Sequence, residues 1–239
     1  MREYTIGLVG GMGSYATVDI FKRIVDAFPA QKEWERPRII IDNRCTMPSR
    51  VRAILYNEKV DEVEEKLSES VRNMIGMGCD YVILGCNTSH YFYDNIIRRT
   101  PEAKGKLLNI IKMCADEVSI NENIDKVFLI ASEGTLITRI FDDCFANNGI
   151  DIVVPKEEDY PVIRNFIESV KQNNIDQELN NFETYVKQIP LEYIILGCTE
   201  LPVLYEKTDF ININKKFIDP IDIAISYLKR EYLKGYNNE

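Results

Sequence analysis

The sequence YVILGC at residues 81–86 returns as YIILGC at residues 193–198, 112 positions further along the chain. Each copy is an apolar run without internal alternation, the pattern of a strand buried on both faces of a parallel sheet. A threonine follows each cysteine closely, Thr88 after Cys86 and Thr199 after Cys198. An offset near half the 239-residue chain predicts two similar α/β halves with equivalent strand ends, although strand consensus alone also produces such hexapeptides.

Short β-branched runs alternate with amphipathic helical stretches along the whole chain. Predicted strands cover residues 5–9, 38–42, 81–85, 126–131, 151–154 and 193–197, and predicted helices cover 16–28, 59–74, 91–99, 136–146 and 161–171. The predicted boundaries agree with helix signals at four positions: Asn57 before an acidic first turn, and Gly76, Gly78 and Gly149 after helix ends. The pattern is typical of an α/β fold with parallel sheets under helices.

The charge balance and the apolar runs limit the partners of this chain. The formal net charge is −9 without a basic tract, which argues against nucleic acid or an anionic membrane, because phosphates select basic surfaces. No apolar stretch approaches the roughly 20 residues needed to cross a bilayer. We therefore expect a cytoplasmic protein with a small-molecule ligand.

Six cysteines and a single histidine define the possible metal and thiol chemistry. The cysteines lie far apart without a CxxC pair, which favours reduced thiols over disulfides or a zinc ribbon. With His90 as the only histidine, no metal site is predicted. Four cysteines are expected to be small buried core residues: Cys45, Cys79, Cys114 and Cys144.

Cys86 and Cys198 have a different position, since both follow a predicted strand where the next helical segment begins. Functional groups in open α/β sheets gather at such strand ends. A helix N-terminus favours thiolate over thiol and is expected to lower the cysteine pKa, as a general base requires. Two thiols on opposite faces of one carbon suit the inversion of a stereocentre.

Abstraction of an α-proton leaves charge that must spread into the substrate carboxylate, so the site needs preorganised donors. Candidates are the amides of residues 10–13 and the side chains of Asn87, Thr88 and Thr199. The glycine turn at residues 10–13 either cradles an anion or is only a tight turn. Its spacing fits neither the dinucleotide nor the Walker pattern.

Five segments resemble the aspartate/glutamate racemase family: GLVGGMGSYAT at 7–17, DNRCTMPSR at 42–50, LGCNTSHYFYD at 84–94, EGTLITRIF at 133–141 and LGCTELPVL at 196–204. They occur in family order and span nearly the whole chain. The resemblance implies two pseudo-symmetric α/β domains, each a parallel sheet flanked by helices, with the active site in the cleft between them. It also implies catalysis without a cofactor, a homodimer, and Cys86 and Cys198 as acid and base.

The same resemblance implies a set of substrate-binding residues: Met12, Arg50, Asn87, Thr88, Thr135, Lys171, Thr199 and Glu200. Glu200 is expected to meet the substrate ammonium and Arg50 the distal carboxylate of an acidic substrate. Lys171 is the looser match, because its neighbouring sequence is not distinctive. Ser14 and Ser49 depart from the family pattern, where many relatives carry proline and aspartate. Ser14 is expected to cap the following helix, and Ser49 puts strict aspartate specificity in doubt.

The expected division places residues 1–113 with 214–239 in the half that carries Cys86, and residues 114–213 in the half that carries Cys198. The predicted function is racemisation of aspartate, glutamate or both without pyridoxal phosphate. Alternatives are a related hydantoin racemase, maleate isomerase or arylmalonate decarboxylase, and a non-catalytic amino-acid sensor on the same frame. The paired thiols argue against the decarboxylase and the sensor. His90 either packs beside Cys86 or tunes it across a helical turn.

Overall fold

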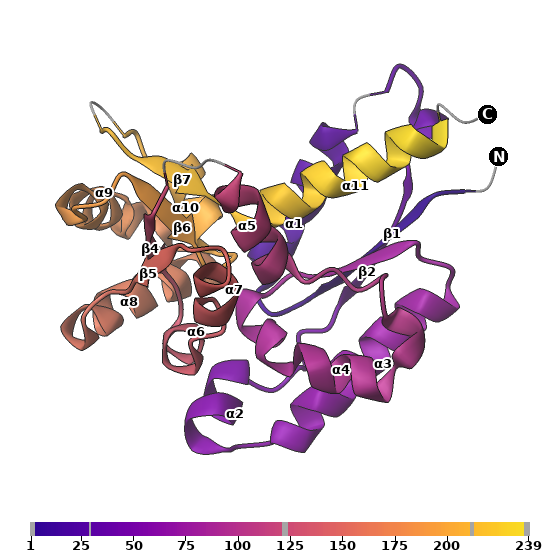
Figure 1. Cartoon of the computed structure of the whole chain (residues 1–239), viewed down its shortest axis with the longest axis horizontal. Helices are drawn as coiled ribbons and strands as arrows, with labels where there is room; N and C mark the ends of the chain where they lie inside the picture. The colour runs from indigo at the N-terminus through magenta and orange to yellow at the C-terminus, as the bar shows by residue number, and fades with distance from the viewer. Residues whose placement is uncertain (1–2, 29, 121–123, 211–212, 237–239) are drawn as a thin grey trace.

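The computed structural model describes residues 3–28, 30–120, 124–210 and 213–236, which form two lobes (Figure 1). One lobe holds a parallel sheet of order β2-β1-β3 and the other a parallel sheet of order β5-β4-β6-β7. The first sheet comprises β1 (Thr5–Gly10), β2 (Arg38–Asn43) and β3 (Tyr81–Leu84). The second comprises β4 (Lys126–Ile130), β5 (Asp151–Val153), β6 (Tyr193–Leu196) and β7 (Lys216–Ile218).

The strand orders of the two sheets are equivalent, as the repeated hexapeptide predicts. In the first sheet β1 lies between β2 and β3, and in the second sheet β4 lies between β5 and β6. The strands of the repeat, β3 and β6, therefore have equivalent positions. Val82 of β3 bridges to Leu107, and β6 pairs with β7 at the same position. The predicted α/β fold with two similar halves is therefore confirmed.

Eleven α-helices are described, and they surround the two sheets. They are α1 (Ser14–Ala27), α2 (Arg50–Tyr56), α3 (Val60–Gly76), α4 (Tyr93–Arg99), α5 (Ile110–Ser119), α6 (Glu133–Thr138), α7 (Asp142–Ala146), α8 (Tyr160–Lys171), α9 (Leu179–Gln188), α10 (Leu201–Glu206) and α11 (Pro220–Tyr236). A 3-10 helix, η2 (Asn87–Phe92), links β3 to α4. In Figure 1, α5 lies where the lobes meet and α11 runs from there over the first lobe.

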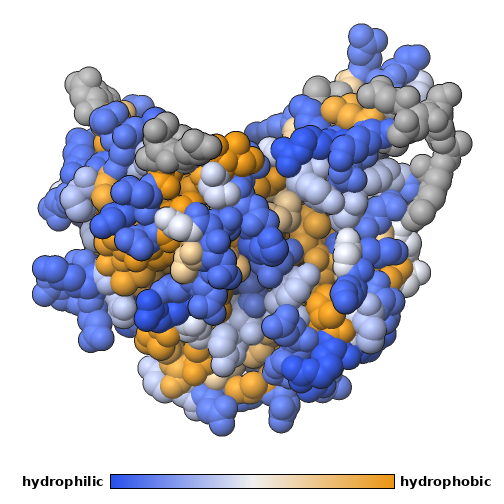
Figure 2. Space-filling model, viewed as in Figure 1, coloured by the Kyte–Doolittle hydropathy of each residue, from blue (hydrophilic) through white to orange (hydrophobic). Residues whose placement is uncertain are grey.

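Alternate residues of the strands contact different hydrophobic clusters, which places helices on both faces of each sheet. Ile83 of β3 and Ile195 of β6 join a central cluster with α1, α5, α7 and α11. The neighbouring residues of β3 join a cluster with α3, and those of β6 join one with α8 and α9. On the face in Figure 2, hydrophilic residues cover much of the surface, with hydrophobic ones between them. The central cluster joins the lobes into one core.

Several predicted boundaries are wrong. The helix predicted over 136–146 is two helices, because Arg139 ends α6 in the left-handed region with φ of 54°. Asn57 does not begin a helix but ends α2 with φ of 56°, and the helix expected to end at Met74 continues to Gly76. The expected division of the chain into halves stays a prediction: of residues 214–239, β7 pairs with β6 in the second sheet, whereas α11 packs against α1, which follows β1 of the first sheet, and against α5.

Candidate active site

The two repeated cysteines lie at the carboxyl ends of β3 and β6, in one buried region between the sheets. Cys86 is the N-cap of η2 and is 8% exposed, and Cys198 precedes α10 and is 9% exposed. The Thr199 hydroxyl donates to the carbonyl of Gly85 at 3.3 Å, which ties the end of β6 to the end of β3. Charge on Cys86 contributes to raising the pKa of Cys198, so the thiols are electrostatic neighbours.

The Cys198 thiol donates a hydrogen bond to Oε2 of Glu200 at 2.9 Å. Burial raises the pKa of Cys198 well above its usual value, and the carboxylate charge of Glu200 adds to the rise, whereas Lys171 opposes it. The sequence-based expectation that a helix N-terminus lowers this pKa is therefore wrong for Cys198, because burial and the adjacent carboxylate outweigh the helix. Cys198 is a protonated thiol at neutral pH.

Glu200 is 2% exposed, and its second oxygen, Oε1, has no hydrogen-bond partner among the described residues. Gly13, the N-cap of α1, leaves room for this position of the carboxylate, because a Cβ there would lie 2.6 Å from Oε1. Burial lowers the pKa of Lys171, but the charges of Glu200 and Cys198 outweigh it, so the pKa is raised. A buried, charged oxygen with an open hydrogen-bonding position is suited to a cation.

Asn87 provides a second unpaired polar group beside Cys86. It is 1% exposed, and neither its Nδ2 nor its Oδ1 has a hydrogen-bond partner among the residues that the structure describes. An unsatisfied buried donor or acceptor costs about 1–3 kcal/mol, so two on one amide require an explanation. A ligand that accepts from Nδ2 and donates to Oδ1 would supply one.

Three hydroxyl groups join the halves next to Asn87. Thr88 Oγ1 of η2 lies 2.9 Å from Ser132 Oγ and 2.9 Å from Thr135 Oγ1, both in the second half. Sequence reasoning missed Ser132, although its position as an N-cap directly after a predicted strand is a recognisable signal. Gly134 allows the close approach, since a Cβ there would lie 3.3 Å from Thr88.

The glycine turn between β1 and α1 has a structural reason. Gly11 has φ of +80°, and a Cβ there would lie 2.4 Å from the backbone of Arg44. Its N–H donates to Thr17 Oγ1 at 3.0 Å, so this amide is not free to bind an anion. Met12 is buried next to η2, where Ser89 Oγ lies 3.2 Å from its sulfur.

Comparison with known proteins shows which family the chain belongs to. Residues 9–228 match the family described as Asp/Glu/Hydantoin racemase. The chain belongs to this racemase family. Over 206 residues it is 23% identical to the broad specificity amino-acid racemase RacX of Bacillus subtilis, covering 82% of this chain and 85% of that protein.

Solved structures of racemases share the fold of this family member. The aspartate racemase of Picrophilus torridus has a TM-score of 0.82 and 21% identity, covering 96% of this chain and 94% of that one. The glutamate racemase of Francisella tularensis in complex with D-glutamate has a TM-score of 0.66 and 19% identity, covering 99% and 83%. The two-domain fold expected from the resemblance is thus confirmed.

Arg50 lies at the site but is already engaged. Its Nη1 donates to the carbonyl of Pro48 at 3.0 Å and its Nη2 to the carbonyl of Met12 at 2.8 Å. Its Nε is buried without a hydrogen-bond partner in the described part of the chain. Arg50 therefore holds the Met12 turn, with Nε left as a donor for a ligand.

His90 contacts the backbone beside Cys86 and not its sulfur. Nδ1 lies 3.1 Å from the carbonyl of Cys86, and Nε2 accepts from the N–H of Ile110 at 3.4 Å. Burial lowers the pKa of His90 to about 4, so the ring is neutral at physiological pH. The arrangement agrees with the packing role, which ties η2 to α5.

The two departures from the family pattern are explained by local contacts. Ser49 is the N-cap of α2 and accepts from the N–H of Arg52 at 3.2 Å. Ser14 does not cap α1, a correction of the sequence-based expectation. Its hydroxyl accepts from Asn43 at 3.2 Å and lies 3.1 Å from the sulfur of Cys45. Cys45 is exposed and Cys144 half-buried, so the expectation of buried core cysteines holds only for Cys79 and Cys114.

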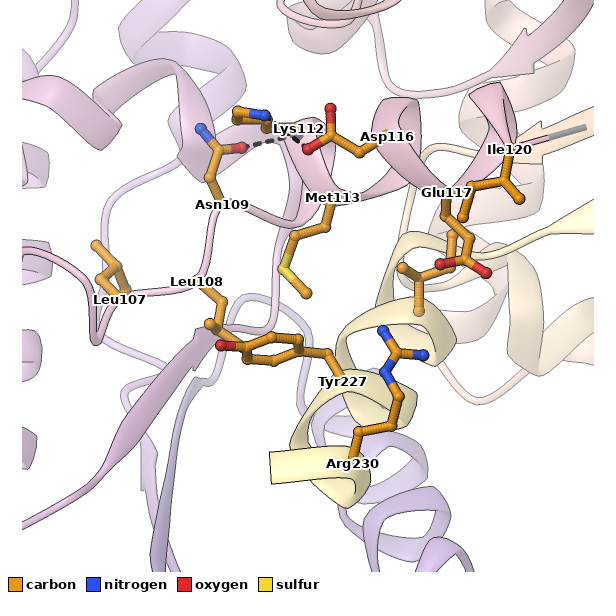
Figure 3. A pocket seen from close by; sticks show the side chains of 11 residues that line it. Leu107, Leu108, Asn109, Lys112, Met113, Asp116, Glu117, Ile120, Tyr227 and Arg230 are labelled. Atoms are coloured by element: carbon orange, nitrogen blue, oxygen red, sulfur yellow. Dashed lines mark hydrogen bonds and ion pairs between the residues drawn. The ribbon is translucent and has the colours of Figure 1, made fainter. Parts of the chain in front are cut away.

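Three further observations on the described residues concern other possible kinds of site. A hollow of about 400 Å³ between α5 and α11 contains neither Cys86 nor Cys198 (Figure 3). Lys112 at its rim is paired with Asp116 at 2.6 Å. Among the described residues there is no group of three or more histidine, cysteine or acidic side chains that could hold a metal ion. None of the described helices is long and apolar enough to span a membrane.

Proposed function

We propose that this chain racemises amino acids without a cofactor, by proton transfer between Cys86, Cys198 and the substrate α-carbon. The observation that carries the proposal is the set of unpaired buried polar atoms beside two buried thiols: Asn87 Nδ2 and Oδ1, and Glu200 Oε1. The family to which the chain belongs supports the same reaction. The catalytic roles expected for the two cysteines rest on this geometry and on the family resemblance.

In the proposed complex the substrate ammonium meets Oε1 of Glu200, and the substrate carboxylate accepts from Asn87 Nδ2 and the neighbouring threonine hydroxyls. Thr88 and Thr135 are hydrogen-bonded to one another, and Thr199 donates to the carbonyl of Gly85, so in the complex these hydroxyls would turn from those partners to the carboxylate. Charge that develops at the α-carbon spreads into the carboxylate, where preorganised donors stabilise it. The positive charge of Lys171 lies near Glu200 and partly offsets the negative charge of that carboxylate.

The reaction transfers one proton to each face of the same carbon. The thiolate of one cysteine takes the α-proton, and the thiol of the other donates its proton to the opposite face. Burial and Glu200 raise the pKa of Cys198, which favours its thiol form and so its part as proton donor. The substrate ammonium offsets the charge of Glu200 and so facilitates the proton transfer from Cys198. After one turnover the two sulfurs have exchanged protonation states.

The substrate predicted from the sequence is aspartate, glutamate or both. The Picrophilus torridus and Francisella tularensis proteins support it, since they are named as aspartate and glutamate racemases. Nε of Arg50 is the donor available for a distal carboxylate. The name of the Bacillus subtilis relative, a broad specificity racemase, favours a wider range. A homodimer stays a prediction from the family resemblance.

The single-cysteine variants test the mechanism. Cys86→Ala and Cys198→Ala should both lose net racemisation, while each retains α-proton exchange in deuterium oxide with one enantiomer only. By the family resemblance, Cys86→Ala keeps exchange with the L-isomer and Cys198→Ala with the D-isomer. Cys144→Ala, in α7, is the matched control and should keep the wild-type rate.

Chiral chromatography and mass spectrometry of the α-deuterium measure both outcomes. Racemisation at the wild-type rate by either variant excludes the two-thiol mechanism. Binding of amino acids without exchange in the unmodified protein would instead identify a sensor.

A further inference from the structure

A second hollow of about 400 Å³ lies between α2, α6 and α8. Apolar and aromatic side chains form much of its wall, including Val51 and Leu55 of α2 and Tyr160, Ile163 and Ile167 of α8. Its volume falls within the roughly 300–1,000 Å³ typical of ligand pockets and exceeds what the side chain of aspartate fills.

Two residues that line this hollow also contact or lie near residues of the proposed active site. Lys171 lines it and also lies beside Glu200 and Cys198, whose charges raise the pKa of this lysine. Ser132 lines it and bonds to Thr88 at 2.9 Å, two residues after Cys86. Lys171 and Ser132 therefore border both the hollow and the residues of the proposed active site.

The cations that line the hollow are already paired with carboxylates. Lys171 lies 2.9 Å from Glu168, and Arg164 forms an ion pair with Glu133. Arg52 donates to both oxygens of Glu58 at 2.7 Å.

A carboxylate that entered the hollow would have to compete with these acids and would lose hydration against the apolar part of its wall. A long uncharged side chain does not have this cost, and it gains about fourfold in affinity for each buried methylene.

We propose that the substrate side chain occupies this hollow and that the preferred substrates are amino acids with long uncharged side chains, such as leucine, methionine and phenylalanine. The inference rests on the proposed racemase function and names its substrate class. Leu55 is the specificity-determining residue that we choose for a test, because it is half-buried and lines the hollow.

The experiment compares kcat/KM for leucine, methionine, phenylalanine, alanine, lysine, aspartate and glutamate by chiral chromatography. The wild-type protein should use the three long uncharged amino acids at least tenfold better than aspartate. Leu55→Trp fills the hollow and should lower kcat/KM for these three at least tenfold, with little change for alanine. Val18→Trp, on an exposed part of α1, is the control and should change none of them.

A second variant tests the subsite even if the tryptophan of Leu55→Trp does not fit into the hollow. Leu55→Arg adds a cation to the wall of the hollow and should raise kcat/KM for glutamate relative to leucine at least tenfold. Preference for aspartate, glutamate or lysine in the wild-type protein, or unchanged rates with phenylalanine in Leu55→Trp, overturns the subsite and leaves the racemase proposal standing. Absence of racemisation and of α-proton exchange with every amino acid overturns the racemase proposal itself.

Discussion

Glu200 connects the chemistry of Cys198 to substrate binding through its two oxygens. Oε2 accepts from the thiol at 2.9 Å, while Oε1 is buried without a described partner. Glu200→Gln keeps the shape and removes the charge. We expect the pKa of Cys198 to fall, because the carboxylate that helps raise it is gone. We also expect KM to rise about tenfold or more, since a hydrogen bond to a charged group is worth about 1.5–3 kcal/mol.

The rate of alkylation of Cys198 as a function of pH, in a Cys86→Ala background, measures the first effect. Steady-state kinetics of the single variant measure the second. Glu65→Gln on the exposed face of α3 is the matched control. An unchanged pH dependence of the alkylation rate would show that Glu200 does not affect the pKa of Cys198.

Arg50 allows a test of how an acidic substrate would be held. Because its Nη1 and Nη2 bond to the carbonyls of Pro48 and Met12, we expect Arg50→Ala to loosen the turn for every substrate. The fall in kcat/KM should be similar for glutamate and leucine, about tenfold in each. A loss confined to glutamate, of about 2 kcal/mol, would instead show a clamp on the distal carboxylate.

At the scale of the elements, α2 depends on Asn57 to end it. Asn57 has φ of 56°, a region that asparagine and glycine tolerate better than other residues, and its N–H donates to the carbonyl of Arg52. Asn57→Ala should lower the free energy of unfolding by about 1 kcal/mol, whereas Asn57→Gly should leave it nearly unchanged. Thermal unfolding by calorimetry measures both. Equal stability of the two variants would exclude a conformational role.

The strands and the thiols could be predicted because their signals are local. Buried parallel strands are continuous apolar runs, and the repeat identified the equivalent ends that carry Cys86 and Cys198. Helix α2 is only seven residues long, so its periodicity is weak, and the acidic residues after Asn57 predict a helix start there instead. The break at Arg139 has no glycine or proline to mark it. The engagement of Arg50 depends on carbonyls brought near by folding, which spacing does not show.

At the scale of the whole molecule, a buried ion cluster holds α1 to the end of β7 and the start of α11. Arg23 of α1 bonds to Asp219 at 2.6 Å and to Asp222 at 2.7 Å, and its Nε lies 2.9 Å from Asp19. Helix α1 follows strand β1 of the first sheet, and β7 is a strand of the second sheet. The cluster therefore connects the two lobes. Three carboxylates share one guanidinium, and burial raises the pKa of both Asp19 and Asp219.

This cluster makes the stability of the protein depend on pH. Burial raises the pKa of Asp219 from 3.8 to about 6, although Arg23 opposes the rise. The folded state therefore binds a proton more tightly than the unfolded state, so this contribution to stability is complete below pH 3.8 and is lost as the pH rises to about 6. Asp219→Asn removes the titration and keeps an oxygen for the N–H of Ile221, which bonds to Asp219 at 2.8 Å.

Relative to the wild-type protein, Asp219→Asn should therefore gain stability as the pH rises from 4.5 to 7.5, by about 2 kcal/mol. Urea unfolding at several pH values in this range measures the difference. Asp222→Asn is the control: its carboxylate also pairs with Arg23 but is 62% exposed. The difference in unfolding free energy between this variant and the wild type should change by less than about 0.5 kcal/mol over the same pH range. A constant difference for Asp219→Asn across this range would mean that Asp219 stays ionised, with Arg23 overcoming the cost of burial.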